Sequence, residues 1–184
     1  MLFINLSYAQ EVYKDYKDFY KSGKLKTLGK LTNNNNEVGE WKTYYENGKI
    51  ATIKNYNLTG DIIGDWKQYH KTGGLKSIGK INNNGKLIGK WKWYYKTGYI
   101  KVIGEFDENG NHNGDWMFFY PNNTLRKNLY YKNGKLMEVI SYFDIKGNPI
   151  NKGTLINGNG TVRYYNLEEE FIEEIIYIDG IEKK

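Results

Sequence analysis

Carboxylates recur at one position of a repeated pattern and are the first candidates for chemistry. The position directly after a glycine holds Glu40, Asp65 and Asp115, with Lys90 where a fourth carboxylate would stand. On neighbouring hairpins of a sheet such side chains would lie about 10 Å apart, which approaches the separation in inverting glycosidases. Because a regular lattice produces this spacing by default and nothing marks out one pair, we assign these residues no catalytic role.

The two histidines, His70 and His112, offer no alternative. They lie 42 residues apart without the spacing of metal ligands, and we expect both at the surface. The chain has no cysteine, which excludes thiolate nucleophiles, disulfides and zinc–thiolate sites. No phosphate-binding loop and no Ser-His-Asp pattern is visible. The sequence therefore predicts a protein that is not an enzyme, with no catalytic residues, no metal site and no cofactor.

These residues are positioned by a repeat. Four of the five tryptophans follow one another at intervals of 25 residues, and each lies two residues after a glycine. Self-similarity at a fixed period indicates a repeat architecture, which usually serves binding. The unit reads Gly-x-Trp-Lys-x-Tyr-Tyr-x-x-Gly-x-Ile in its clearest form. The structural repeat residues are Gly39, Trp41, Gly64, Trp66, Gly89, Trp91, Gly114 and Trp116.

Each copy is expected to form two antiparallel β-strands. Short segments rich in Trp, Tyr, Ile, Val and Thr are separated by turn residues such as Asn47-Gly48 and Asn133-Gly134. Asn-Gly is a strong hairpin signal because a type I′ turn needs positive φ at both central residues. The connections are too short for parallel crossovers. The sequence therefore predicts an all-β fold, an elongated single-layer antiparallel β-hairpin array of about six hairpins.

The second strand of each copy carries apolar residues three positions apart, as at Leu25, Leu28 and Leu31. A flat strand cannot place all three on one face, so either a bulge intervenes or both faces carry apolar groups. Glycine recurs in the middle of this strand, which indicates curvature or a group that presses on the backbone. We expect that group to be a neighbouring tryptophan ring. The glycines are Gly29, Gly79 and Gly104.

Three regions are expected along the chain. Residues 14–143 hold the repeats, with a degenerate first copy in which Tyr16 takes the tryptophan position, and residues 144–184 hold irregular hairpins and an acidic end. The acidic end is interpreted as a C-terminal cap, with a partner-specific strand or a short helix as alternatives. Residues 1–9 resemble the remnant of a secretory signal peptide, because a short apolar run precedes Ser7 and Ala9. This favours an exported protein over a cytoplasmic one with a frayed first strand.

Two ladders of basic residues follow from the repeat. One ladder lies on the face opposite the tryptophans and runs beside an aromatic position, whereas Lys26, Lys76, Lys101 and Arg126 form the other. Lysines and aromatics together suit an acidic protein partner, although they also serve as ordinary cover for an exposed sheet. The predicted partner-binding residues are Lys17, Lys42, Tyr44, Lys67, Tyr69, Lys92, Tyr94 and Phe119.

The charge distribution limits the classes of partner. The net charge is +6, but residues 168–184 carry seven acidic and two basic side chains. Nucleic acid is not expected, because the basic residues are nearly all lysine and no nucleic-acid-binding motif is present. No apolar run of about 18 residues exists, so no transmembrane segment is expected, although contact with a membrane surface stays open. We expect a monomer that binds a protein.

The unit Gly-x-Trp-x-x-Tyr-Tyr-x-x-Gly-x-Ile/Leu resembles the variant MORN repeat of bacterial YwqK-type antitoxin proteins. The resemblance covers residues 14–143 well and residues 144–180 loosely. It implies an open antiparallel β-array used for protein contact, and an antitoxin or immunity protein that occludes a cognate toxin. The alternative is an envelope or cell-surface scaffold, and a weaker one is docking on anionic lipid.

Overall fold

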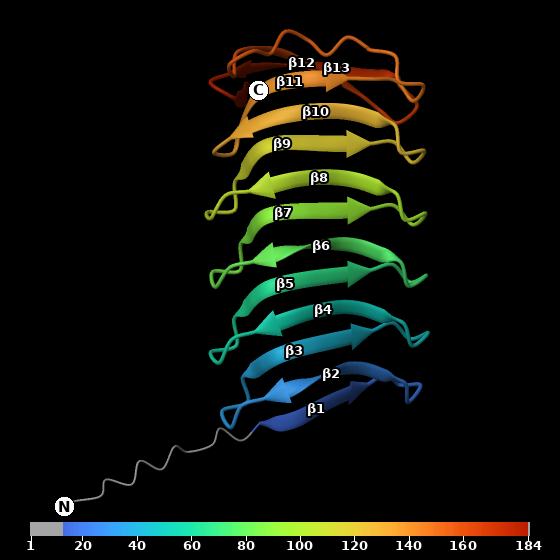
Figure 1. Cartoon of the computed structure of the whole chain (residues 1–184), viewed down its shortest axis with the longest axis vertical. Coiled ribbons are helices and arrows are strands. Elements are labelled where there is room, and N and C mark those ends of the chain that lie inside the picture. The colour runs from blue at the N-terminus through green and yellow to red at the C-terminus, as the bar shows by residue number, and fades with distance from the viewer. Residues whose placement is uncertain (1–12, 184) are drawn as a thin grey trace, which may run out of the picture.

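The computed structural model describes residues 13–183, which form two antiparallel β-sheets and no helix (Figure 1). The expected hairpin array is confirmed: eleven strands, each paired with the next, make one open sheet. These strands are β1 (Lys14–Phe19), β2 (Leu25–Leu31), β3 (Glu37–Tyr44), β4 (Ile50–Tyr56), β5 (Ile62–Tyr69), β6 (Leu75–Ile81), β7 (Leu87–Tyr94), β8 (Ile100–Phe106), β9 (His112–Phe119), β10 (Leu125–Lys132) and β11 (Lys135–Tyr142). The expected signal-peptide remnant at residues 1–9 lies outside the described residues. Within residues 13–183, no helix could cross a membrane.

Two kinds of turn join the strands. In the repeating kind, Tyr45 N–H donates to the Lys49 carbonyl and Gly48 N–H donates to the Tyr45 carbonyl, and only Gly48 of the Asn-Gly pair has positive φ. Asn133 and Gly134, by contrast, both have positive φ, at 51° and 80°. Of these two Asn-Gly pairs, therefore, only the second has the backbone of a type I′ turn.

A wide bulge explains the Gly-x-Trp motif. Leu28 pairs with Lys42 and Lys30 pairs with Val38, so a four-residue step along β3 opposes a two-residue step along β2. Gly39 lies in this bulge with a φ of 68°, which side chains rarely adopt. The bulge positions Trp41 so that its indole packs on the backbone of Gly29.

The tryptophan ring is held there by packing and by one hydrogen bond. A Cβ added at Gly29 would collide with the Trp41 indole. The ring is only 3% exposed, and its Nε1–H donates to the Lys30 carbonyl at 3.2 Å. The expectation that a tryptophan covers the mid-strand glycine is therefore confirmed, and the same contact recurs at Gly79 under Trp91 and at Gly104 under Trp116.

Trp66 departs from this arrangement. The residue at its glycine position is Lys54, whose ammonium lies 6.0 Å from the Trp66 ring centroid. Because a lysine side chain occupies the space that glycine leaves free elsewhere, Trp66 is only partly buried, in contrast to Trp41 and Trp91.

A second bulge distributes the apolar residues of each second strand. Leu25 pairs with Phe19 while Thr27 pairs with Asp18, so Lys26 is the extra residue and Leu25 and Leu28 share one face. This face is called the lysine face below. The third residue of the series lies on the opposite face, called the tryptophan face, where Tyr56 contacts Trp41 at 5.9 Å between ring centroids. Both explanations for the three-residue spacing are therefore correct in part.

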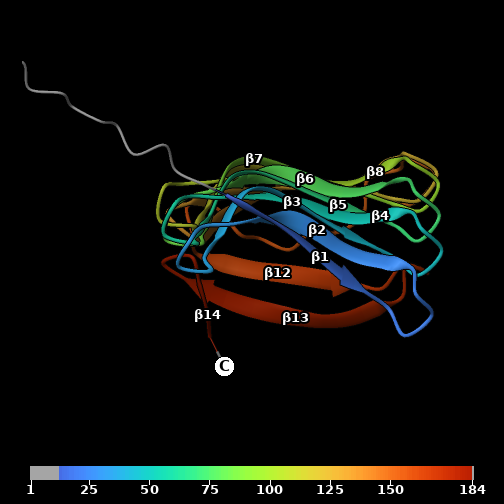
Figure 2. The same ribbon diagram turned by 90° about the horizontal axis from the view of Figure 1, so that it is seen from below.

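The last three strands form a second layer that the sequence did not predict. β12 (Gly160–Tyr165), β13 (Phe171–Ile178) and β14 (Ile181–Lys183) make a separate sheet. Figure 2 shows β12 and β13 on one side of the long sheet. The acidic segment enters β13, so it is a strand and not a short helix. The core between the layers consists of Trp116, Leu129, Leu136, Val139, Leu155, Val162 and Tyr177.

Candidate functional site

The four predicted lysines of the lysine face lie in one row across the sheet. Lys42 pairs with Leu28 on one side and with Ile53 on the other, and the following lysines repeat this arrangement. Lys42, Lys67 and Lys92 therefore each stand between two aliphatic side chains of neighbouring strands, whereas Lys17, in the edge strand β1, pairs with Leu28 alone. This lysine row consists of Lys17, Leu28, Lys42, Ile53, Lys67, Ile78, Lys92, Ile103 and Met117.

The predicted aromatic residues form a second row on the same face. Tyr44 lies two residues beyond Lys42 on its strand and pairs with Ile50. The same pairing joins Tyr69 to Leu75, and Phe19 at the first hairpin is 53% exposed. The structure thus brings all the predicted partner-binding residues to one open face, but it does not by itself identify a partner.

Carboxylates flank the lysine row on its other side. Glu40 accepts from the Lys42 ammonium at 2.7 Å, and this hydrogen bond raises the pKa of Lys42. In the next hairpin Asp65 pairs with Lys80 across the strands. The lysine row therefore lies between a row of mixed charge and an aromatic row, so the face is not a simple basic stripe.

The charge pattern changes at β7, where Lys90 replaces the carboxylate that precedes the ladder lysine in the repeats containing Lys42 and Lys67. Two shallow hollows, of about 330 and 440 Å³, meet at Lys90 and Lys92. The first hollow also includes Lys80 and Tyr94, and the second includes Glu105 and Met117. Asp65 and Asp115 also line these hollows, so this part of the face offers ammonium and carboxylate groups beside apolar surface, a combination that suits a protein partner.

The second tyrosine of each repeat has a structural role. Tyr45 O–H donates to the Tyr69 carbonyl at 2.7 Å, and Tyr95 O–H donates to the Phe119 carbonyl at 2.7 Å. His70 takes this position in its own repeat, with its Nε2 atom 3.1 Å from the Tyr94 carbonyl. These contacts tie each hairpin to the next one along the array.

His112 was expected at the surface, and the structure places it half-buried at the start of β9. Its ring lies 4.0 Å from the Trp116 ring between centroids and 5.0 Å from Tyr131, on the tryptophan face. Burial in this aromatic cluster lowers the pKa of His112. Within residues 13–183, no group of three or more His, Asp or Glu side chains could hold a metal ion.

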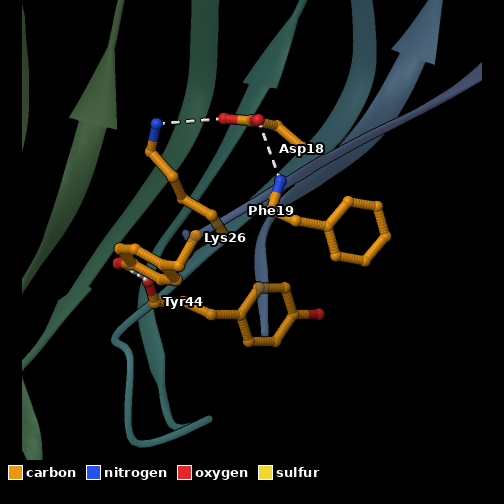
Figure 3. Close-up of polar contacts among 5 residues, drawn as sticks. Asp18, Phe19, Lys26 and Tyr44 are labelled. Carbon is orange, nitrogen blue, oxygen red and sulfur yellow. Dashed lines mark hydrogen bonds and ion pairs between the residues drawn. The ribbon is translucent and has the colours of Figure 1, made fainter. Parts of the chain in front are cut away.

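The second basic ladder reaches the tryptophan side through the bulges of the second strands. Figure 3 shows its first member, Lys26, donating to Asp18 at 3.0 Å while Asp18 also accepts from the Phe19 N–H at 2.8 Å. The hydrogen bond from Lys26 lowers the pKa of Asp18. Its last member, Arg126, donates to the carbonyls of Tyr165 and Asn166 and so holds the C-terminal sheet.

Sequence reasoning missed a lysine that is surrounded by aromatic rings between the two sheets. The Lys127 ammonium lies 4.9 Å from the Phe118 ring, 5.6 Å from Tyr142 and 5.4 Å from Tyr164. Burial lowers the pKa of Lys127 to about 8. The available signal was Phe118, which, like Trp93 one copy earlier, is aromatic at a position where the copies around Trp41 and Trp66 carry Thr43 and Gln68.

The fold and its repeated positions define an open β-hairpin repeat protein, one face of which stays uncovered along the long sheet. Four segments match the family model of the MORN repeat variant, and those around Trp41, Trp91 and Trp116 each contain a whole Gly-x-Trp bulge. The matched residues are 37–58, 87–108, 113–133 and 128–144. No curated protein matches the chain. MORN repeats are commonly non-catalytic modules that bind proteins or membranes.

Proposed function

We propose that this chain is a non-enzymatic protein-binding module that acts as an antitoxin or immunity protein by covering the active site of a cognate toxin. Export to the bacterial envelope or beyond, and action as a monomer, are parts of the same proposal. The partner would lie on the lysine face. Its acidic side chains would meet Lys42, Lys67 and Lys92, and its apolar groups would meet the aromatic row.

One observation carries this proposal: the face of the long sheet that the C-terminal sheet leaves uncovered (Figure 2) aligns lysine, aliphatic and aromatic side chains in parallel rows from β1 to β9. Aromatic anchors within a field of charges are typical of protein interfaces. The hollows at Lys90 and Lys92 add concave surface in the middle of this face. The match to the repeat family supports the part of the proposal that concerns a binding module. The antitoxin role is a more specific proposal than that match supports.

The test is capture of partners by the full-length chain from the organism that encodes it, followed by a growth assay. An antitoxin should capture one protein in equal proportion, which inhibits growth when expressed alone and not when expressed with this chain. The variant Lys42→Glu, Lys67→Glu and Lys92→Glu should weaken binding at least tenfold. The matched control reverses three lysines at equivalent turn positions, Lys21, Lys71 and Lys96, and should bind as the native chain does.

The outcomes separate the alternatives. Equal loss of binding in both triple variants would refute the lysine face as the contact surface. A captured protein without effect on growth would refute the antitoxin role and favour the envelope scaffold. Retention of anionic vesicles by the native chain, abolished by salt, would instead favour a membrane-surface role.

A further inference from the structure

The tryptophan face changes character at β7. One row of paired residues across this face is polar in the first half of the array, where Thr43 donates to or accepts from Thr52 at 2.7 Å. From β7 onward the same row carries Trp93, the one tryptophan outside the 25-residue series, followed by Val102 and Phe118, and it ends at Lys127. The row consists of Thr27, Thr43, Thr52, Gln68, Ser77, Trp93, Val102, Phe118 and Lys127.

At its C-terminal end this row is covered by the chain itself. The ring of Tyr164, from β12, lies over Lys127, which pairs with Phe118. The two carbonyls that follow, of Tyr165 and Asn166, accept from the Arg126 guanidinium. The array therefore already binds one extended segment, through an aromatic ring and the backbone carbonyls beyond it.

One repeat earlier the same set of positions is open. Val102 takes the position of Lys127, Trp93 that of Phe118, and Lys101 that of Arg126. A hollow of about 310 Å³ lies there, lined by Trp93, Lys101, Val102, His112, Trp116 and Phe118. Its wall includes Trp93 and Val102, which are the equivalents, one repeat earlier, of Phe118 and of the Lys127 that the Tyr164 ring contacts.

The cation at this hollow supports the comparison. Lys101 is exposed, and its ammonium lies 5.8 Å from the Tyr95 ring centroid. In the described part of the chain, no carboxylate forms an ion pair with Lys101. Trp93 is partly buried, and its ring stacks on Trp91 at 5.6 Å and lies 5.8 Å from Trp116, so one wall of the hollow is a fixed aromatic surface.

We propose that the tryptophan face of β7–β9 binds an extended segment of a partner protein, with an aromatic side chain in this hollow and the following backbone carbonyls at Lys101. This segment would lie on the same face of the long sheet as the C-terminal sheet, one repeat before the position of Tyr164. The proposal is independent of the lysine face, which is on the other side of the sheet.

The probe is a synthetic peptide with the sequence of residues 162–167, Val-Arg-Tyr-Tyr-Asn-Leu, blocked at both ends and labelled for fluorescence anisotropy. The peptide carries the chain's own example of such a segment, and it contains no tryptophan. Saturable binding to the full-length chain is expected, together with a change in the selectively excited tryptophan emission. A peptide with alanine in place of Tyr164 should bind at least tenfold more weakly.

Two variants test the location on the protein. Trp93→Gln installs the residue that Gln68 provides one repeat earlier, and it should weaken binding at least tenfold while the chain stays folded by circular dichroism. Lys101→Ala should weaken binding about threefold, whereas the matched Lys76→Ala, beside Gln68, should have no effect. The lysine-row charge-reversal variant should bind the peptide as the native chain does.

The proposal is overturned if the peptide does not saturate, or if Trp93→Gln and Lys76→Ala behave alike. Binding that survives Trp93→Gln would mean that the peptide displaces β12 and does not use the hollow. A change in tryptophan emission on concentrating the native chain without peptide, lost in Trp93→Gln, would make a second copy the occupant and would also overturn it. The peptide titration of the native chain still tests the proposal even if a variant fails to fold.

Discussion

Gly79→Ala is the sharpest test of how the repeat is built. The substitution adds one methyl group, and that Cβ would collide with the Trp91 indole. Gly79 has no positive φ, so the backbone itself accepts alanine. In the absence of the ring, Gly→Ala at such a position would stabilise the protein by about 0.4–1 kcal/mol, because it restricts the unfolded chain. The collision therefore reverses the expected sign.

The magnitude follows from the burial of Trp91, which is 3% exposed. Complete expulsion of a tryptophan exposes on the order of 150–250 Å², worth about 4–6 kcal/mol at ~25 cal/mol per Å². A displacement that exposes half of the Trp91 ring would lower the free energy of unfolding by about 2–3 kcal/mol. Loss of the hydrogen bond from Trp91 Nε1–H to the Lys80 carbonyl, at 3.1 Å, adds about 1 kcal/mol. We expect a loss of about 3 kcal/mol in the free energy of unfolding.

Urea denaturation and thermal melting of the full chain measure this loss. A decrease of about 3 kcal/mol would lower the melting temperature by roughly 6–12 °C for a chain of this length. Because repeat arrays can lose two-state behaviour, hydrogen exchange of β6 and β7 should be followed as well. Gly74→Ala is the control, since Gly74 also has no positive φ and nothing lies within 4 Å of its added Cβ.

A double-mutant cycle identifies the cause. In a Trp91→Leu background the collision disappears, so Gly79→Ala should lose most of its penalty there. The reasoning is refuted if Gly79→Ala is as stable as the native chain, or if its penalty is the same with leucine at position 91.

Three further changes test the aromatic layer and the join to the C-terminal sheet. Lys127→Met should raise the free energy of unfolding by about 1–3 kcal/mol at pH 7. The pKa of Lys127 in the folded chain is about 8, below its ordinary value of 10.5. The gain in stability should therefore shrink as the pH rises from 8 to 10.5. A gain that stays constant in urea melts across this pH range would contradict the burial argument. Burial also lowers the pKa of His112 from 6.5, so its contribution to stability is lost as the pH falls below that value, and His112→Phe should lose less stability between pH 7 and pH 5 than the native chain. Arg126→Ala removes the charged donor to the Tyr165 and Asn166 carbonyls, so limited proteolysis should cut residues 143–159 first, whereas unchanged protection would show that packing alone holds the C-terminal sheet.

Much of the fold could be predicted because the repeat makes each local signal occur several times. Glycines, tryptophans and turn residues at one period indicated the hairpins, their order and the face on which Lys42 and Trp41 lie. The packing of a ring on Gly29 was also predictable, because a mid-strand glycine indicates that something approaches the backbone. The wide bulge at Gly39 could not be predicted. Neither strand contains a signal that tells how many residues of its partner it will oppose.

The C-terminal layer could not be predicted, because its signals are long-range. The strand patterns of β12 and β13 were visible, but their place depends on Arg126 reaching the carbonyls of Tyr165 and Asn166, about 40 residues further along the chain. The aromatic contacts of His112 were not predicted for a similar reason, since its ring lies against Trp116 and Tyr131 and not against its own turn.

The candidate sites differ in how far the repeat itself explains them. The lysine row follows from duplication, so its regularity alone cannot distinguish a binding face from ordinary cover of an exposed sheet. Departures from the repeat carry more information, because duplication does not produce them. Lys54 in place of glycine leaves Trp66 partly exposed, Lys90 in place of a carboxylate creates the lysine cluster on one face, and Trp93 opens the apolar hollow on the other. Since Lys90 and Trp93 both lie in β7, the middle of the array is where each face departs most from its repeat, and partner contacts should concentrate there.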